Sequence, residues 1–374
     1  MPPHAGGRRR GPGSWSTGIL VGACIVAAVA GGVIGGVIVN AFSSSSSPGG
    51  TASSSGAGTS AHTCLVTPVA RETLPSVVTI SVTGPSASGT GSGEVIRSGG
   101  YILTNNHVIA AAASGGSISV MFSNGTTADA ELTGRDPLTD IAVIKVSGEN
   151  DLRVIPVGES GKLVIGQPVV VLGAPLGLSS TVTSGIVSAL DRTIQVPGED
   201  NQSALLVDAV QTDAAINPGN SGGAMVNCAG QFVGMPTAGA TVPSSSGEAS
   251  GGSIGLGFAI PSYLALRVAD EIITTGHAAH SYLGLQVSSL SADAANGADE
   301  GLLITGIDPS GPAQQAGLRV GDIITTIDGE QAVRTDQLVS VTLTKKPGDK
   351  VEIGYKRDGQ TATTSVTLGE QPTG

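Results

Sequence analysis

The sequence predicts a mostly β protein of the antiparallel barrel or sandwich class, preceded by a single membrane-spanning helix. Short runs rich in Val, Ile and Leu fill residues 74–261 and are separated by Gly, Pro and Asn or Asp turns. These runs follow one another too closely for helical crossovers, which favours antiparallel sheets. Near the N-terminus, one apolar run is long enough to cross a bilayer.

The chain is acidic, with 18 Lys and Arg against 29 Asp and Glu in 374 residues, and only 2% of its residues are aromatic. The length allows two domains with room for small modules. Hydrophobic residues make up 40% of the chain, which excludes a disordered acidic protein. We expect no nucleic-acid partner, because the chain lacks a basic stripe and the aromatic side chains on which bases stack.

The 21 residues from Ile19 to Val39 comprise only Ile, Leu, Val, Ala, Gly and one Cys. A helix of that length is roughly 31 Å long, which matches the hydrocarbon core of a bilayer. A cleaved signal peptide is the alternative, but its apolar core is typically shorter. We therefore predict a transmembrane helix over residues 18–41, after a short basic tip over residues 1–17.

The charges around this run predict its orientation. Three consecutive arginines, Arg8 to Arg10, precede it, and the next basic residue is Arg71. The positive-inside rule then places the N-terminus in the cytoplasm and the later domains outside a cell membrane that the chain crosses once. Residues 42–63 are rich in Ser and Gly and predict a flexible tether.

Cysteine usage is compatible with export. Cys24 lies in the predicted span, which leaves Cys64 and Cys228 on the outer side of the membrane. A disulfide between these two is a hypothesis, since an oxidising compartment favours paired cysteines. Two free thiols are the alternative, because the sequence does not give the Cα separation that the bond requires.

Three motifs in the first exported domain carry chemistry: Thr104–Val108, Asp136–Asp140 and Asn217–Gly223. A serine hydroxyl is a weak nucleophile that needs a base, usually an imidazole oriented by a buried carboxylate. Of the five histidines, only His107 lies in the same domain as Ser221. His107 is therefore the only histidine of that domain that could serve as the base.

The order His107, Asp140, Ser221, within Thr-Asn-Asn-His-Val, Asp-Ile-Ala-Val and Gly-Asn-Ser-Gly-Gly, resembles the HtrA/Deg family of chymotrypsin-fold serine proteases. The resemblance covers roughly residues 66–370. It implies a trypsin-like protease domain of two six-stranded β-barrels over residues 64–262, with the triad in the cleft between them.

The resemblance also implies a role for each residue. Ser221 would be the nucleophile, His107 the general base and then acid, and Asp140 the orienting carboxylate. The oxyanion hole would consist of the backbone N–H groups of Gly219 and Ser221, with Asn220 between them. Two other carboxylates near these motifs are expected to be structural: Asp136, which starts a turn, and Asp213.

Specificity follows from the residue six positions before the nucleophile, which forms the floor of the S1 pocket in this fold. That residue is Ala215, and the predicted apolar walls are Ile216, Thr237 and Leu256. We expect a preference for Val, Ala, Ile or Leu before the scissile bond, because a small apolar pocket gains little from a charge it must desolvate. At the position before Thr237 the family often has an asparagine, where this chain has Pro236. Proline has no backbone N–H, so the chain cannot make the hydrogen bond that this N–H would donate.

An amphipathic helix that ends at Gly276 is predicted in the connecting segment 263–280. Residues 281–370 resemble a single bacterial, circularly permuted PDZ domain, on the strength of Gly-Pro-Ala-Gln-Gln-Ala-Gly-Leu and Gly-Asp-Ile-Ile segments. Its carboxylate-binding loop would consist of Tyr282, Leu283, Gly284 and Leu285. Their N–H groups would bind a peptide C-terminus while the peptide adds to the sheet as a strand.

Together these features predict a membrane-anchored serine endopeptidase that degrades or processes unfolded or mislocalised proteins in protein quality control. A binding or chaperone module with a silent protease fold is the alternative, and a cysteine hydrolase based on Cys228 is a third. No cofactor or metal is expected. A homo-oligomer is possible, although residues 61–100 lack the aromatic residues through which family members form trimers.

Overall fold

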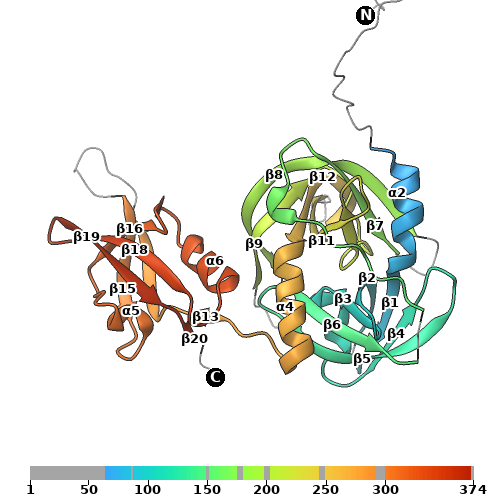
Figure 1. Ribbon diagram of the computed structural model, residues 1–374, viewed down its shortest axis with the longest axis horizontal. Helices are drawn as coiled ribbons and strands as arrows, with labels where there is room; N and C mark the ends of the chain where they lie inside the picture. Colours follow the sequence, from blue (N-terminus) through green and yellow to red (C-terminus); the bar gives the residue numbers. More distant parts are fainter. Residues whose placement is uncertain are drawn as a thin grey trace, which may run out of the picture. The chain divides into compact units, whose positions relative to one another are not determined.

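The computed structural model describes residues 64–85, 87–148, 151–174, 180–197, 203–243, 249–290 and 300–371 (Figure 1). The predicted transmembrane helix and tether lie outside the described residues. Within the described ranges, no helix is both long and apolar enough to cross a membrane.

The first sheet is a closed six-stranded barrel with the strand order β1-β2-β3-β6-β5-β4. Asn124 and Gly125 form the β4–β5 turn: Gly125 has φ +85°, and Asn124 Oδ1 accepts the N–H of Thr126 at 2.9 Å. This is the hairpin that an Asn-Gly pair between two β-branched runs predicts. The strands of this barrel are β1 (Val77–Thr83), β2 (Ser88–Arg97), β3 (Tyr101–Thr104), β4 (Ser117–Met121), β5 (Thr127–Asp136) and β6 (Ile141–Val146).

A second closed barrel follows, with the order β10-β11-β12-β9-β8-β7. Both barrels are antiparallel throughout, as closely spaced strands require. The strands of this barrel are β7 (Pro168–Gly173), β8 (Thr181–Pro197), β9 (Ser203–Thr212), β10 (Ala224–Val226), β11 (Phe232–Pro243) and β12 (Ala249–Pro261). Short helices accompany the two barrels: α2 (Val66–Thr73), η1 (Leu74–Ser76), α3 (Asn106–Ile109), η2 (Ala110–Ala112) and η3 (Ser160–Lys162).

Each barrel has its own core, because alternate side chains of a strand point to opposite faces. Ile80 and Ile144 lie in the core of the first barrel, and Val171 lies in that of the second. Another cluster contains residues of both barrels, including Leu103 and Leu172. This shared core packs the two barrels against each other.

Helix α4 (Ser262–Thr275) packs against β5, β6 and β11. Leu264, Val268 and Ile272 lie on its buried face, at helical spacing. Gly276 has φ +86° and donates its N–H to the carbonyl of Ile272 at 2.8 Å, as expected for a helix that ends at a glycine.

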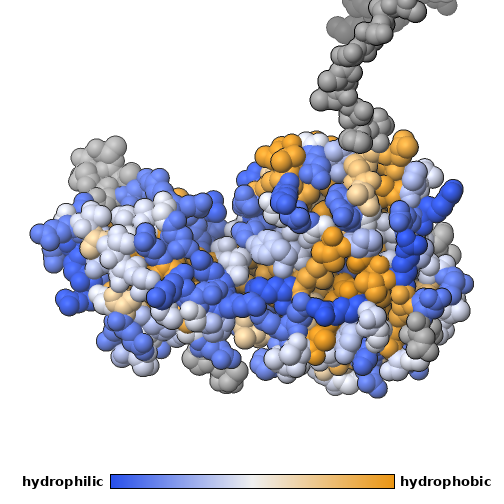
Figure 2. Space-filling model, in the orientation of Figure 1, coloured by the Kyte–Doolittle hydropathy of each residue, from blue (hydrophilic) through white to orange (hydrophobic). Residues whose placement is uncertain are grey.

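The C-terminal domain contains a sheet with the order β14-β15-β16-β18-β19, with β17 paired to β16. Inside this domain, Arg357 makes two 2.6 Å contacts with the buried carboxylate of Asp322. On the face drawn in Figure 2, exposed hydrophobic residues gather mainly on the two-barrel domain, whereas this domain is largely hydrophilic. Its elements are β13 (Ser281–Tyr282), β14 (Leu285–Leu290), β15 (Gly301–Ile307), α5 (Pro312–Gln315), β16 (Ile323–Ile327), β17 (Glu330–Gln331), α6 (Asp336–Thr344), β18 (Lys350–Arg357), β19 (Gln360–Thr367) and β20 (Gly369–Glu370).

Candidate active site

His107 and Ser221 come from different barrels and lie close together. His107 is in α3, directly after β3, and Ser221 precedes β10. The carbonyl of Ser221 accepts the N–H of Ser92 in β2 at 3.0 Å. At Gly222, a Cβ would lie 2.4 Å from the hydroxyl oxygen of Thr104, so only glycine lets the serine loop approach the first barrel this closely.

His107 and Asp140 form a tight pair. The imidazole Nδ1 lies 2.9 Å from Asp140 Oδ2, and the backbone N–H of His107 donates to Oδ1 at 3.0 Å. The carboxylate is buried, so it holds Nδ1 protonated and leaves Nε2 as the acceptor. This is the tautomer that a general base opposite a serine requires.

Asp140 is also fixed through its backbone. It has φ +57°, a left-handed conformation that is uncommon outside glycine. Its carbonyl accepts the side-chain amide of Asn105 at 2.8 Å and the N–H of Asn106 at 3.2 Å. These contacts hold the residue in its strained conformation next to the histidine.

Thr237 contacts Asp140, a relationship that the sequence did not predict. The sequence predicts Thr237 as a wall of the S1 pocket, but its hydroxyl donates to Asp140 Oδ2 at 2.5 Å. The two residues are 97 positions apart, so no local pattern signals the contact. Thr237 therefore orients the carboxylate, and its role as a wall of the S1 pocket stays a prediction.

The hydroxyl of Ser221 donates to the carbonyl of Thr237 at 3.3 Å. Among the contacts of the described residues, it makes no hydrogen bond to His107. Catalytic hydrogen bonds are often loose without substrate and tighten in the reactive complex. The side chain therefore has to move before it can transfer its proton to the imidazole.

Two backbone N–H groups near the serine have no acceptor among the described residues. Gly219 has φ +99°, and the N–H groups of Gly219 and Ser221 donate to no group in the described part of the chain. Unpaired N–H groups of this kind can stabilise an oxyanion. The N–H of Asn220, which lies between them, donates to the carbonyl of Asn217 at 3.0 Å, so Gly219 and Ser221 are the donors expected to form the oxyanion hole.

Ser92 supports this loop from the first barrel, which the sequence did not suggest. Its hydroxyl donates to the carbonyl of Gly219 at 2.5 Å and accepts the N–H of Ala174 at 2.8 Å. The contact turns the Gly219 carbonyl toward β2. The loop is thereby anchored on the first barrel as well as on the second.

Around the expected S1 pocket, Ala215 accepts two hydrogen bonds at its carbonyl, from the hydroxyl of Thr183 and the side-chain amide of Asn220. Ile216 is buried in the core of the second barrel, directly beneath Gly257. Leu256 is 38% exposed. An apolar S1 pocket with Ala215 as its floor stays a prediction.

Asp213 and Asp136 have structural partners. Asp213 Oδ1 accepts the N–H of Ile186 at 2.7 Å, which ties the segment after β9 to strand β8. Asp136 accepts the N–H of Leu138 at 3.2 Å, as expected for an Asp that starts a turn. Neither carboxylate contacts the pair of His107 and Asp140.

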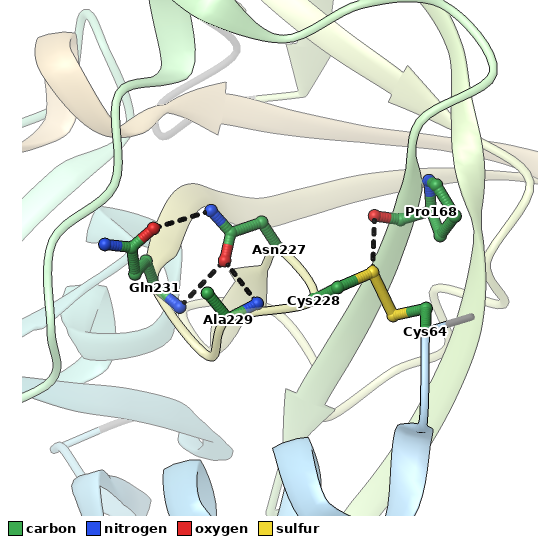
Figure 3. Close-up of a disulfide and its surroundings, with 6 residues drawn as sticks. All are labelled: Cys64, Pro168, Asn227, Cys228, Ala229 and Gln231. Carbon is green, nitrogen blue, oxygen red and sulfur yellow. Dashed lines mark hydrogen bonds between the residues drawn. A yellow bond between two sulfur atoms is a disulfide. The ribbon is translucent and has the colours of Figure 1, made fainter. Parts of the chain in front are cut away.

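Cys64 and Cys228 are bonded in the structure, with a Cα–Cα distance of 5.2 Å. Cys64 directly precedes helix α2, and Cys228 lies in the β10–β11 turn (Figure 3). Asn227 shapes this turn, since its side-chain oxygen accepts the N–H groups of Ala229 and Gln231. The bond thus attaches the start of the domain to the second barrel.

In the C-terminal domain, the loop over residues 282–285 precedes β14, an edge strand of the sheet. Gly284 has φ +74°, and its carbonyl accepts the N–H of Asp308. The N–H groups of Leu283 and Gly284 donate to no group in the described ranges. Tyr282 donates its hydroxyl to Asp308 at 2.9 Å, which raises the pKa of the tyrosine and helps to fix the loop.

The described residues contain no group of three or more His, Cys, Asp or Glu side chains that could hold a metal ion. The groups that the site brings together are the serine, the paired imidazole and carboxylate, and the backbone N–H groups described above.

Comparison with known proteins identifies both domains. The family model for the trypsin-like peptidase domain matches residues 91–235, and the model for the PDZ domain matches residues 281–368. The sequence is 43% identical to serine protease PepD of Mycobacterium tuberculosis over 81% of this chain and 65% of that protein. It is 36% identical to the periplasmic pH-dependent serine endoprotease DegQ of Escherichia coli, over 80% of this chain and 69% of DegQ.

Solved structures agree with these matches. The HtrA-type protease AlgW with a tripeptide superposes with a TM-score of 0.67 at 35% identity, over 83% of this chain and 98% of AlgW. The chain spans between about half and two thirds of the length of most of the curated relatives it matches. With a trypsin-like domain, a PDZ domain and relatives of this similarity, the chain belongs to the HtrA family of serine proteases.

Proposed function

We propose that this chain is a serine endopeptidase in which Ser221, His107 and Asp140 form the catalytic triad. The observation that carries the proposal is the pairing of His107 Nδ1 with the buried Asp140 carboxylate beside Ser221. That pairing leaves Nε2 free as a base on the side where a serine proton would be accepted.

Acylation would begin when Ser221 turns from the Thr237 carbonyl and gives its proton to His107 Nε2. The hydroxyl oxygen attacks the scissile carbonyl carbon, and the carbonyl electron pair moves onto its oxygen. The N–H groups of Gly219 and Ser221 would stabilise this oxyanion. As the tetrahedral intermediate collapses, the imidazolium protonates the leaving amine, which departs with its peptide.

Deacylation would repeat these steps with water. His107 takes a proton from a water molecule, whose oxygen attacks the acyl-enzyme carbonyl. Collapse of the second intermediate releases the new carboxyl terminus, and the imidazolium returns the proton to the Ser221 oxygen. Asp140 stays ionised throughout and stabilises the imidazolium in both halves of the reaction.

For substrates, we propose unfolded or mislocalised proteins, cleaved after small apolar residues. Ala215 stands six positions before Ser221, where the floor of the S1 pocket is expected, and it has no carboxylate to bind Arg or Lys. The loop over residues 282–285, with free N–H groups beside the edge strand β14, supports binding of a peptide C-terminus as an added strand. The solved relative AlgW is described with a bound tripeptide.

For location, we propose that residues 18–41 anchor the chain in a cell membrane and that both folded domains are extracytoplasmic. The apolar run from Ile19 to Val39 and the preceding arginines support this placement. DegQ and the DegP-like relatives are described as periplasmic. Protease accessibility in spheroplasts, where the outer face of the cytoplasmic membrane is exposed, and in lysed spheroplasts would test the orientation: digestion of both domains only after lysis would contradict it.

The direct test of the activity uses full-length protein in detergent beside its Ser221→Ala variant, with casein as an unfolded substrate. The proposal predicts new casein fragments with the parent and none with the variant. Equal cleavage by both would exclude Ser221 as the nucleophile. Binding of casein without cleavage by the parent would favour a chaperone or binding module. This outcome has to be tested because the Ser221 hydroxyl rests against the Thr237 carbonyl and not against His107.

A further inference from the structure

His280 ends the segment that follows helix α4, and its imidazole contacts the two-barrel domain. Nε2 lies 3.0 Å from Asp136 Oδ1, and the two side chains are only 12% and 6% exposed. Its backbone is bound elsewhere: the carbonyl of His280 accepts the N–H of Gln371 at 2.9 Å. The residue is therefore held from two sides, with its side chain directed at Asp136.

Asp136 organises the turn that presents the catalytic carboxylate. It is the last residue of β5, and Asp140 lies four positions later, directly before β6. Besides the imidazole, Asp136 accepts the N–H of Leu138 and the hydroxyl of the buried Thr139. The conformation of the whole turn therefore depends on where this carboxylate is held.

The connecting segment is packed against β5 at a second point. A Cβ on Gly134 would lie 2.3 Å from the carbonyl oxygen of Gly276, so the backbones of the two glycines approach closely. Between the two points, the N–H of Ala279 donates to Glu271 Oε2 at 3.3 Å. The segment thus lies along β5 from Gly134 to Asp136, and the contact of His280 is part of a docked structure.

The turn needs such support because of the backbone of Asp140. Its left-handed conformation is strained for a residue with a Cβ and persists only where surrounding contacts determine it. The N–H groups of Asn106 and His107 both donate to Asp140, at its carbonyl and its carboxylate respectively. A shift of the turn would therefore move the base as well as the carboxylate.

We propose that His280 is a positioning residue for the hydrolysis proposed above: through Asp136 it holds the turn that presents Asp140 to His107. This inference rests on the proposed function of the triad. His280 touches neither the substrate nor the reacting atoms, and its effect is on the rate of the chemical steps. Replacement of the imidazole leaves Asp136 bonded only to Leu138 and Thr139 of the same turn. Asp140 is then held less firmly in the position where it meets His107.

The first experiment compares kinetics of the full-length protein with four variants on a chromogenic peptide substrate. His280→Ala is expected to lower kcat about ten-fold with KM changed less than about two-fold, because residues in one hydrogen-bond network are coupled at that level. His280→Gln keeps a donor at the position of Nε2 and restores kcat, whereas His280→Asn, whose amide is shorter, does not. His277→Ala, on an exposed residue of the same segment, is the matched control and keeps the parental kcat.

A double-mutant cycle with Asp136→Asn tests whether His280 acts through Asp136. Asp136→Asn combined with His280→Ala is expected to lower kcat by less than the product of the two single effects, because both act on one contact. An unchanged kcat in His280→Ala, equal effects of His280→Gln and His280→Asn, or fully multiplicative effects would each overturn the inference.

A readout without activity separates this inference from the proposed function. Amide hydrogen exchange at Asn106 and His107 reports whether their N–H groups stay bonded to Asp140. Faster exchange there in His280→Ala, with parental exchange in His277→Ala, supports the positioning role even if the parent cleaves nothing. Parental exchange in both variants contradicts it, whatever the parent does to casein.

Discussion

The hydroxyl of Thr237 donates to Asp140 Oδ2 at 2.5 Å, although Thr237 lies in the second barrel and Asp140 on a turn of the first. The carboxylate also pairs with His107 of the first barrel. Its orientation therefore depends on the packing of the two barrels against each other. The shared core that contains Leu103 and Leu172 provides this packing.

Removal of this hydroxyl is expected to lower kcat. Thr237→Val keeps the shape of the side chain but removes a hydrogen bond to a charged group, worth about 1.5–3 kcal/mol. If most of that energy orients the carboxylate, kcat falls about ten- to a hundred-fold with little change in KM. Thr237→Ser retains the hydroxyl and is the control. Steady-state kinetics on a peptide substrate measure kcat and KM of both variants. Equal kcat for Thr237→Val and Thr237→Ser would refute the role of the hydroxyl in orienting Asp140.

Glu94 is expected to make stability depend on pH. It is fully buried, neither carboxylate oxygen has a hydrogen-bond partner in the described ranges, and its strand neighbours are Val77 and Leu103. Burial raises the pKa of Glu94 well above its ordinary value of 4.5, because the neutral acid is easier to bury than the carboxylate.

The sign follows from linkage. Above a pH of about 4.5 the unfolded chain loses the Glu94 proton while the folded chain retains it, so the folded state loses stability as the pH rises. Glu94→Leu removes this effect and is expected to raise the unfolding free energy more at pH 8 than at pH 4. Denaturation with urea at both pH values measures it, with the exposed Glu131→Leu as control. A gain of equal size at both pH values would argue against a raised pKa.

The bond between Cys64 and Cys228 is expected to stabilise the two-barrel domain. It joins residues 164 positions apart, and a loop of that length corresponds to roughly 5 kcal/mol in the chain-entropy model. Replacement of both cysteines by serine should lower the thermal unfolding temperature, and reduction should do the same to the parent but not to the variant. Alkylation of both thiols in unreduced protein would show that the bond is absent in solution.

Gly284 is expected to be required for binding of peptide C-termini. It has φ +74°, and a Cβ there would lie 3.0 Å from the Cα of Gly311. Gly284→Ala should therefore distort the loop and weaken binding of a C-terminal peptide about ten-fold or more. Isothermal titration with a free-acid peptide and its C-terminal amide measures the effect. If the parent binds the two peptides equally, the loop does not recognise a carboxylate.

The sequence predicted the local parts of this molecule well. The Asn124-Gly125 hairpin and the helix that ends at Gly276 follow from short motifs, and the pairing of His107 with Asp140 follows from the resemblance to the HtrA/Deg family. The motifs work because turn, cap and triad chemistry restrict which residues can stand at a few neighbouring positions.

The contacts that the sequence did not reveal join distant positions through common polar side chains that no motif marks for those contacts. Ser92, Thr237 and His280 are common polar residues whose side-chain partners lie 82 or more positions away. The motif around Ser221 also does not indicate that the N–H of Asn220 closes a turn with the carbonyl of Asn217. The spacing of residues in a motif does not predict which backbone N–H groups stay unpaired when the loop folds.

The most direct test of the triad is covalent labelling of full-length protein with a fluorophosphonate, followed by mass mapping of the adduct. The triad predicts one adduct, on Ser221, with labelling slowed at least about a thousand-fold in His107→Ala because the base is lost. Asp213→Asn, which can still accept the N–H of Ile186, should label at the parental rate. An adduct on another residue, or unchanged labelling of His107→Ala, would contradict the assignment of Ser221 and His107 as nucleophile and base.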